Sequence, residues 1–192
     1  FRSATSFNQD LSDWDVSSVT NMSHMFYNAT AFNGDISSWD VSNVTSMNQM
    51  FRIATNFNQD LSGWDVSSVE NMNEIFSGCT MFNADISTWN VSNVTNMSYM
   101  FDNAASFNQD ISNWDVSNVM NMIDMFNNDS LSEDNQCAIH TAFSSNDNWP
   151  YDWSEFCFIP GCTDESACNY NSEAEEDDGS CLLDDCAGVC GG

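Results

Sequence analysis

The chain has 192 residues and a formal net charge of −27, from 29 acidic residues against two arginines and no lysine. This balance argues against nucleic-acid binding, because phosphate recognition needs lysine and arginine to displace counterions. No apolar run approaches the roughly 20 residues that a membrane-spanning helix needs. The acidity fits divalent cations or a basic partner instead.

Residues 1–126 are built from a 25-residue unit that occurs five times and begins with a partial copy. Phe1 and Ala4 lie in register with Phe26 and Ala29, so we expect a further coil upstream in a larger protein. A fixed period of this length is typical of a solenoid, in which neighbouring units bury each other's apolar faces. The most regular column is aromatic: Trp14, Trp39, Trp64, Trp89 and Trp114.

Each unit contains two kinds of apolar pattern. Met22, Met25, Phe26 and Ala29 follow the i, i+3, i+4, i+7 spacing of a short helix. The segment 11–16 is rich in β-forming residues and follows turn-forming Asn and Asp. We therefore predict an α/β solenoid with one short parallel strand and one short helix per repeat, in the manner of a leucine-rich repeat.

The sequence of the repeat resembles that of a known family. Trp-Asp-Val-Ser followed by Asn-Met-x-x-Met-Phe is similar to the BspA-like repeat proteins, and to a 25-residue repeat first catalogued in mycoplasma surface proteins. The resemblance covers residues 1–126. It implies a right-handed, leucine-rich-repeat-like coil on a secreted or cell-surface protein, with adhesion to host matrix proteins or cells among some relatives.

The repeat pattern stops after Phe126. We expect residues 127–160 to form a C-terminal cap over the last core layer, stapled by Cys137 and Cys157. Residues 161–192 are acidic and rich in cysteine, and resemble a short module found in tails of secreted marine microbial proteins. This similarity implies an extracellular tail and no activity.

Seven of the eight cysteines lie in the last third of the chain. Their spacings do not match paired C-x2-C zinc ligands, so we expect disulfides and an oxidising, extracellular compartment. The tail alone contains five cysteines, and one of these must pair outside the tail. The predicted disulfide residues are Cys137, Cys157, Cys162, Cys168, Cys181, Cys186 and Cys190.

Two apolar columns suggest binding as well as packing. The tryptophans could stack against sugars, but burial in the core is the favoured interpretation. The methionines could bind copper(I), yet Ile75 replaces Met25 in one copy, and a metal ligand would not tolerate that change. We therefore assign both columns to the core.

Recurring carboxylates suggest calcium. Aspartate recurs at two positions of the repeat, in columns that begin with Asp10 and Asp15. These carboxylates could hold calcium between coils or accept amide hydrogen bonds within their own turns. Turn formation is favoured, because Asn90 replaces one aspartate. In the acidic tail the candidate calcium ligands are Asp164, Asp177 and Asp178.

No set of nucleophile, base and orienting group recurs, so we predict that the chain is not an enzyme. Cys79 replaces alanine in a core column and is expected to be a buried thiol. Asn-x-Ser/Thr sequons create candidate glycosylation sites at Asn21, Asn28, Asn43, Asn90, Asn93, Asn96 and Asn128.

The sequence thus predicts a non-enzymatic extracellular protein with a structural or adhesive role in a cell-surface glycoprotein or a filament. Its partners would be other extracellular proteins or further copies of itself. The alternative is a module that recognises a polysaccharide or a matrix protein through the repeat face. No cofactor is expected other than calcium.

Overall fold

The computed structural model describes residues 1–128, 130–158 and 160–182. Contacts divide the chain into two compact units, Phe1–Asp152 and Trp153–Gly192. The elements are helix α1 (Glu133–Phe143), a 3-10 helix η1 (Ser154–Phe156), and the two-residue strands β1 (Pro160–Gly161) and β2 (Glu176–Asp177). The first unit contains the repeats and most of the segment 127–160, whose role as a single cap stays a prediction.

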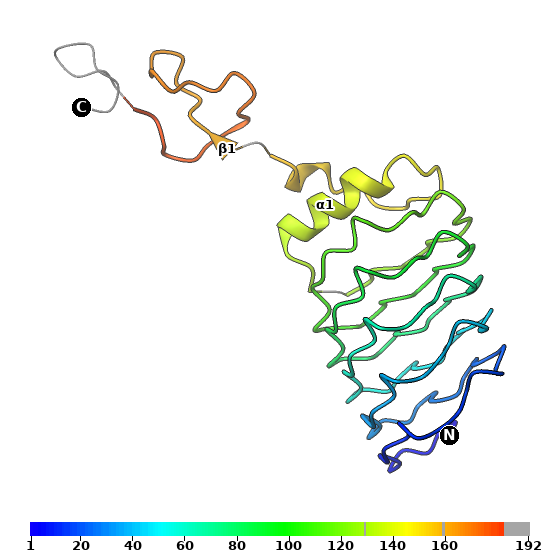
Figure 1. The fold of residues 1–192 in the computed structure, drawn as a ribbon. Coiled ribbons are helices and arrows are strands. Elements are labelled where there is room, and N and C mark those ends of the chain that lie inside the picture. Colours follow the sequence, from blue (N-terminus) through cyan, green and yellow to red (C-terminus); the bar gives the residue numbers. More distant parts are fainter. Residues whose placement is uncertain (129, 159, 183–192) are drawn as a thin grey trace. The chain divides into compact units, whose positions relative to one another are not determined.

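Successive repeats of the first unit stack on one another (Figure 1). Isolated parallel bridges join Asn21 to Ser46, Ser46 to Asn71, Asn71 to Asn96, and Asn96 to Asn121. Further backbone bonds follow the same register; for example, the amide of Thr45 donates to the carbonyl of Thr20 at 2.8 Å. Each repeat thus supplies hydrogen-bond partners for the next.

The short helix expected in each repeat is replaced by a run of turns. The amides of His24 and Phe26 donate to Asn48 and Met50 in the next coil, at 2.9 and 2.8 Å, and so make no bond within a helix. His24 and Asn28 have φ values of 62° and 54°, in the left-handed region. These residues reverse the local backbone, so the apolar spacing marks a folded turn and no helix forms.

The strand expected over residues 11–16 is also absent from the described repeats. The amide of Trp14 donates to the carbonyl of Leu11 at 3.0 Å, which closes a turn within this segment. The side chains of Asp10 and Asp15 accept the amides of Ser12 and Ser17 at either end. Local side-chain bonds of this kind compete with a strand ladder.

Phenylalanine forms the centre of the core. Phe26 and Phe32 stack within one coil with centroids 3.9 Å apart, and Phe26 stacks on Phe51 of the next coil at 5.6 Å. Equivalent pairs recur along the array. The array therefore contains two continuous columns of stacked rings, and valine, leucine, isoleucine and methionine fill the space around them.

Helix α1 closes the last repeat (Figure 1). Ser132 caps it by accepting the amide of Asn135 at 3.4 Å, and the buried side chains Ile139 and Phe143 form its inner face. Trp149 packs edge-on against Phe143, and the hydroxyl of Tyr151 accepts the amide of Phe126 at 2.8 Å. The last core layer is thus covered by side chains that do not follow the repeat.

The second unit is organised by short contacts. Strands β1 and β2 pair in parallel, with Gly161 opposite Asp177. A disulfide joins Cys162 to Cys181. Among the residues that the structure describes, no helix has the length and apolar character required to cross a bilayer.

Candidate functional site

The tryptophan column lies inside the first unit, with one exception. Trp39, Trp64, Trp89 and Trp114 are only 3–4% exposed, and their indole N–H groups donate to carbonyls in the preceding coil. Trp14, in the first copy, is 49% exposed and departs from the expected core column. The four buried indoles present no flat ring to a sugar.

Cys79 is a buried free thiol. Its Sγ donates to the carbonyl of Phe51 at 2.8 Å, and burial raises the pKa of the thiol far above its ordinary value. A thiol in this state forms little thiolate and is a poor nucleophile or metal ligand. The buried methionines, among them Met47 and Met72, likewise lie in the core.

The two aspartate columns form turns. Asp65 accepts the amide of Ser67 at 3.0 Å, and Asn90 makes the same contact with Ser92 at 3.2 Å. Hydrogen bonds from the Ser67 hydroxyl and amide lower the pKa of Asp65 below its ordinary value. In the column of Asp10, the same turn recurs at Asp35, Asp60, Asp85 and Asp110. These carboxylates are structural parts of the repeat.

An asparagine column that sequence reasoning missed links all the coils. The side-chain oxygen of Asn8 accepts the amide of Asn33 at 2.8 Å, and each later asparagine accepts from the next: Asn33, Asn58, Asn83 and Asn108. Asn108 then accepts the amide of Ser132, so α1 continues the column. Five identical residues at one repeat position were the available signal.

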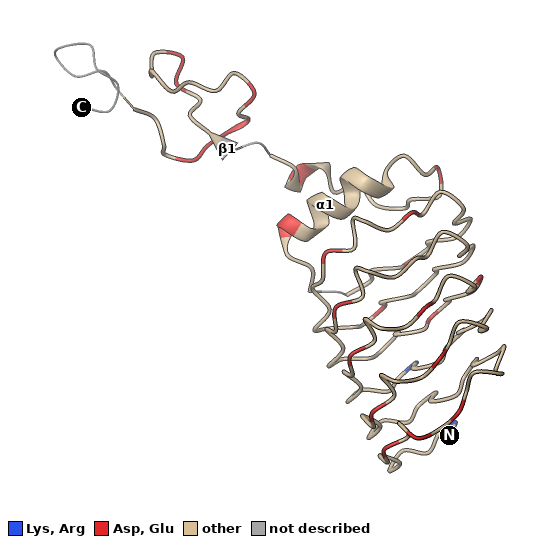
Figure 2. Ribbon diagram, viewed as in Figure 1, with Lys and Arg blue, Asp and Glu red and all other residues tan. Residues whose placement is uncertain are grey.

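Both arginines of the chain contact the ring of Tyr27. The guanidinium groups of Arg2 and Arg52 lie 5.1 and 5.5 Å from the ring centroid of Tyr27. Arg52 also donates to the Tyr27 hydroxyl at 3.1 Å and forms an ion pair with Glu74. Both arginines therefore serve contacts within the first coils, whereas Figure 2 shows acidic residues along the whole repeat array and in the second unit.

The predicted disulfide residues are used as cross-links wherever the structure describes them. Cys137, Cys157, Cys162, Cys168 and Cys181 are all disulfide-bonded. The pairing of Cys137 with Cys157 stays a prediction, and Cys186 and Cys190 lie outside the described residues.

The candidate calcium ligands form local turns. Asp164, Asp177 and Asp178 accept the amides of Ser166, Gly179 and Ser180 respectively. Within the described part of the chain, the structure gathers no group of three or more His, Cys, Asp or Glu residues that could hold a metal ion. Calcium binding by the tail stays a prediction.

The sequon asparagines also make structural contacts. Asn43 and Asn93 donate to carbonyls of the preceding coil at 2.9 and 2.7 Å. Asn21, Asn90 and Asn96 accept the amide two residues ahead. Asn28 has a left-handed backbone, and the Asn128 side chain contacts Asn103. These contacts explain why asparagine recurs, independently of any glycan.

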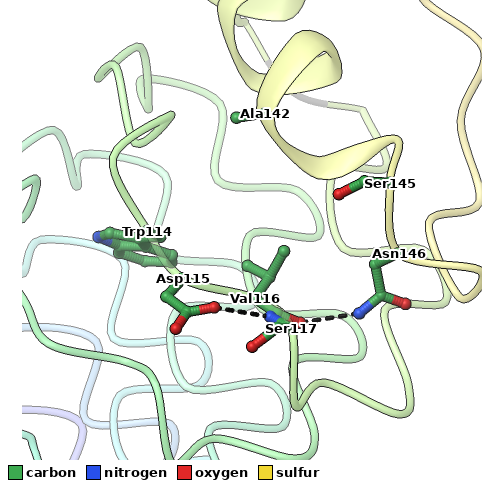
Figure 3. A pocket seen from close by; sticks show the side chains of 7 residues that line it. All are labelled: Trp114, Asp115, Val116, Ser117, Ala142, Ser145 and Asn146. Atoms are coloured by element: carbon green, nitrogen blue, oxygen red, sulfur yellow. Dashed lines mark hydrogen bonds between the residues drawn. The ribbon is translucent and has the colours of Figure 1, made fainter.

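A pocket of about 210 Å³ lies between the last repeat and the end of α1 (Figure 3). Asp115, Val116 and Ser117 line one side, next to Trp114. Ala142, Ser145 and Asn146 line the other side. Asn146 holds the two sides together, because its side-chain amide donates to the carbonyls of Val116 and Val119 at 2.7 and 3.0 Å.

Comparison with known proteins agrees with the repeat pattern. A family described as "Mycoplasma protein of unknown function, DUF285" matches residues 1–80 and 58–142. No curated protein and no solved structure matches the chain. The matched segments include the repeats and all but the last residue of α1, and stop before the cysteine-rich tail.

Proposed function

Because the chain belongs to the DUF285 family of mycoplasma-type repeat proteins, we propose that it is a non-enzymatic structural or adhesive component of a cell surface or an extracellular filament. The observation that carries this proposal is the regular surface of the repeats. The same polar groups recur in each coil and are held by bonds between coils, as in the asparagine column. Repeat arrays use such extended surfaces to bind partners.

We propose that the stack is a variant of the right-handed, leucine-rich-repeat-like coil of BspA-like proteins, with turns in place of the helix. The parallel bridges and the constant offset between bonded coils support this relationship. The aromatic columns favour a stiff array, since close-packed interiors resist compression. A stiff array suits a load-bearing or display role.

The roles of the polar side chains support a non-enzymatic protein. The aspartates of the two columns accept amides in their own turns, and the thiol of Cys79 is buried. The imidazole Nδ1 of His140 accepts the indole N–H of Trp149 at 3.2 Å. These groups stabilise the fold in the positions where they occur.

Disulfides support a location outside the cytosol. They persist in oxidising compartments, and the tail contains the Cys162–Cys181 bond. The alternative role, recognition of a polysaccharide through the repeat face, loses its aromatic platform because the repeat tryptophans after Trp14 are buried. Recognition of a matrix protein remains within the adhesive role.

The proposal is tested on cells that make the protein. Antibodies against the repeats should label intact cells or their extracellular filaments, and brief protease treatment of intact cells should remove the label. Deletion of the gene should reduce attachment or alter the cell envelope, and the intact gene should restore it. Labelling only after permeabilisation, or unchanged attachment and envelope in the deletion strain, would refute the proposal.

A further inference from the structure

The pocket beside α1 differs from the rest of the repeat surface because its upper wall does not follow the repeat. In earlier coils, the segments equivalent to residues 114–117 are followed by another repeat. Here α1 and the turn after it take that place and leave a cavity of about 210 Å³. Sites for drug-sized ligands measure about 300–1,000 Å³, so this cavity suits a group the size of one amino-acid side chain.

The lining combines one acid with apolar walls. Asp115 accepts the Ser117 amide through Oδ1 at 3.0 Å, and Figure 3 shows its carboxylate at the pocket between Trp114 and Val116. The hydrogen bonds from Ser117 hold the pKa of Asp115 below its ordinary value, so the group is ionised at neutral pH. Ala142 adds aliphatic surface, Val116 adds the small part of its side chain that is exposed (4%), and Ser145 adds a hydroxyl.

No lysine or arginine lines this pocket. The chain contains no lysine, and its two arginines are Arg2 and Arg52, which contact Tyr27 in the early repeats. The net charge of −27 attracts cations and repels anions over long range. A cation that complements Asp115 must therefore come from another molecule.

We propose that this pocket binds a lysine or arginine side chain of a basic protein partner. The aliphatic stem would lie against Ala142 and the exposed edge of Val116, and the charged end would donate to Asp115 and the neighbouring hydroxyls. Long basic side chains bury their stems on apolar surface in this manner. The inference names a partner chemistry for the adhesive role, but it does not need the extracellular location, so the two proposals can fail separately.

The test is a titration of the full chain in which NMR measures the amide chemical shifts at each probe concentration. The probe is Nα-acetyl-lysine methylamide, with Nα-acetyl-norleucine methylamide and glucose as neutral probes. We expect saturable shifts at residues 114–117 and 142–146 with the lysine probe, with a dissociation constant in the millimolar range. We expect at least fivefold weaker binding of both neutral probes.

Four variants locate the site. Asp115→Asn should weaken lysine binding at least fivefold while it keeps the turn, since Asn90 makes the same turn. Ala142→Leu and Ser145→Leu should each fill the pocket and abolish saturation. The matched control is Asp65→Asn, which removes the same charge from an equivalent turn in the third copy and should leave binding unchanged.

Dispersed amide spectra confirm that each variant is folded, and the two filling variants provide independent tests. Shifts spread evenly over all aspartate turns, or binding that survives both filling variants, would overturn the proposal. Equal binding of norleucine or glucose would also overturn it and would indicate an apolar or a sugar subsite.

Discussion

The indole N–H of Trp64 donates to the backbone carbonyl of Ile36, 3.1 Å away in the preceding coil. The same bond joins each buried tryptophan to the coil before it. The tryptophan column therefore connects the coils by hydrogen bonds as well as by apolar contact.

Trp64→Phe should destabilise the first unit by about 1–3 kcal/mol, because it removes one of the two donors to the Ile36 carbonyl, leaving only the Trp39 amide, and shortens a buried aromatic side chain. Urea unfolding followed by circular dichroism measures the change. Trp14→Phe is the control, since Trp14 is half-exposed, and it should change stability by less than about 0.5 kcal/mol. Equal effects of the two substitutions would contradict the role of the indole bond.

Gly78 occupies a left-handed position in the turn column that begins with Ser3 and Asn28. Its φ is 70°, and an added Cβ would lie 3.3 Å from Cγ1 of Ile53. Gly78→Ala should therefore cost about 1–2 kcal/mol, and Gly78→Asn should cost less, since asparagine tolerates this conformation.

The control for this prediction is Gly63→Ala. A Cβ at Gly63 would have its nearest neighbour 4.0 Å away, at the Ser37 carbonyl. Gly63→Ala should be neutral, or stabilising by up to about 1 kcal/mol. Thermal unfolding of the three variants in parallel gives the order. If Gly78→Ala were as stable as Gly63→Ala, the left-handed turn would not be required.

The turn column also explains where reasoning from sequence failed. Met22, Met25 and Phe26 have helical spacing, and the periodicity identified them as apolar positions without fixing the backbone. The informative residues were the small and amide side chains: Asn28, Gly78, Asn103 and Asn128 share the left-handed column. Ile53 occupies the same column with a φ of 60°. It obscures the pattern in the sequence, because a β-branched residue rarely adopts this conformation.

Burial was easier to predict than hydrogen bonding. The repeated Phe and Trp columns marked the core, since apolar identity at a fixed period is direct evidence of packing. The asparagine column was missed because Asn is common in turns for several reasons, and only the structure shows that Asn33 contacts Asn8 of the previous coil. The pocket at Asp115 depends on α1, which follows no repeat.

The asparagine column makes its own prediction. Asn58→Ala removes the acceptor of the Asn83 amide, which lies 2.9 Å away. Because the bond is exposed and water can replace it, we expect a loss of about 0.5–1.5 kcal/mol. Asn56→Ala, at an exposed neighbouring position, should have no measurable effect. Hydrogen exchange should also accelerate at the Asn83 amide in the Asn58 variant alone, and unchanged exchange there would count against the bond.

Cys79 should resist modification while the protein is folded. Burial raises the pKa of its thiol, so neither access nor thiolate is available at pH 8. Iodoacetamide, followed by peptide mapping, should label Cys79 only in denaturant. Cys79→Ala should stay within about 0.5 kcal/mol of the parent, because Ala29, Ala54 and Ala104 occupy the same column. Rapid labelling under native conditions would show that the column opens.

The aspartate turns predict the response to acid. Serine hydrogen bonds lower the folded-state pKa of Asp40, Asp65 and Asp115 below the ordinary value of 3.8. A lowered folded-state pKa stabilises the fold above the unfolded value, and this stabilisation is lost as the pH falls through the folded value. The free energy of unfolding should therefore be maintained as the pH falls to about 4, because weaker charge repulsion also stabilises the fold there. It should decrease below about pH 4.

The triple variant Asp40→Asn, Asp65→Asn and Asp115→Asn should lose less stability between about pH 4 and pH 2 than the parent, because asparagine keeps the turn, as Asn90 does, without titrating. The charge-matched control replaces Glu173, Glu175 and Glu176 of the tail by glutamine and should keep the acid response of the parent. The urea unfolding midpoints of the parent, the triple variant and the control, measured across this pH range, provide the comparison. If the triple variant and the parent lose stability in parallel, the turns do not cause the acid sensitivity, and the response would have to arise elsewhere in the chain.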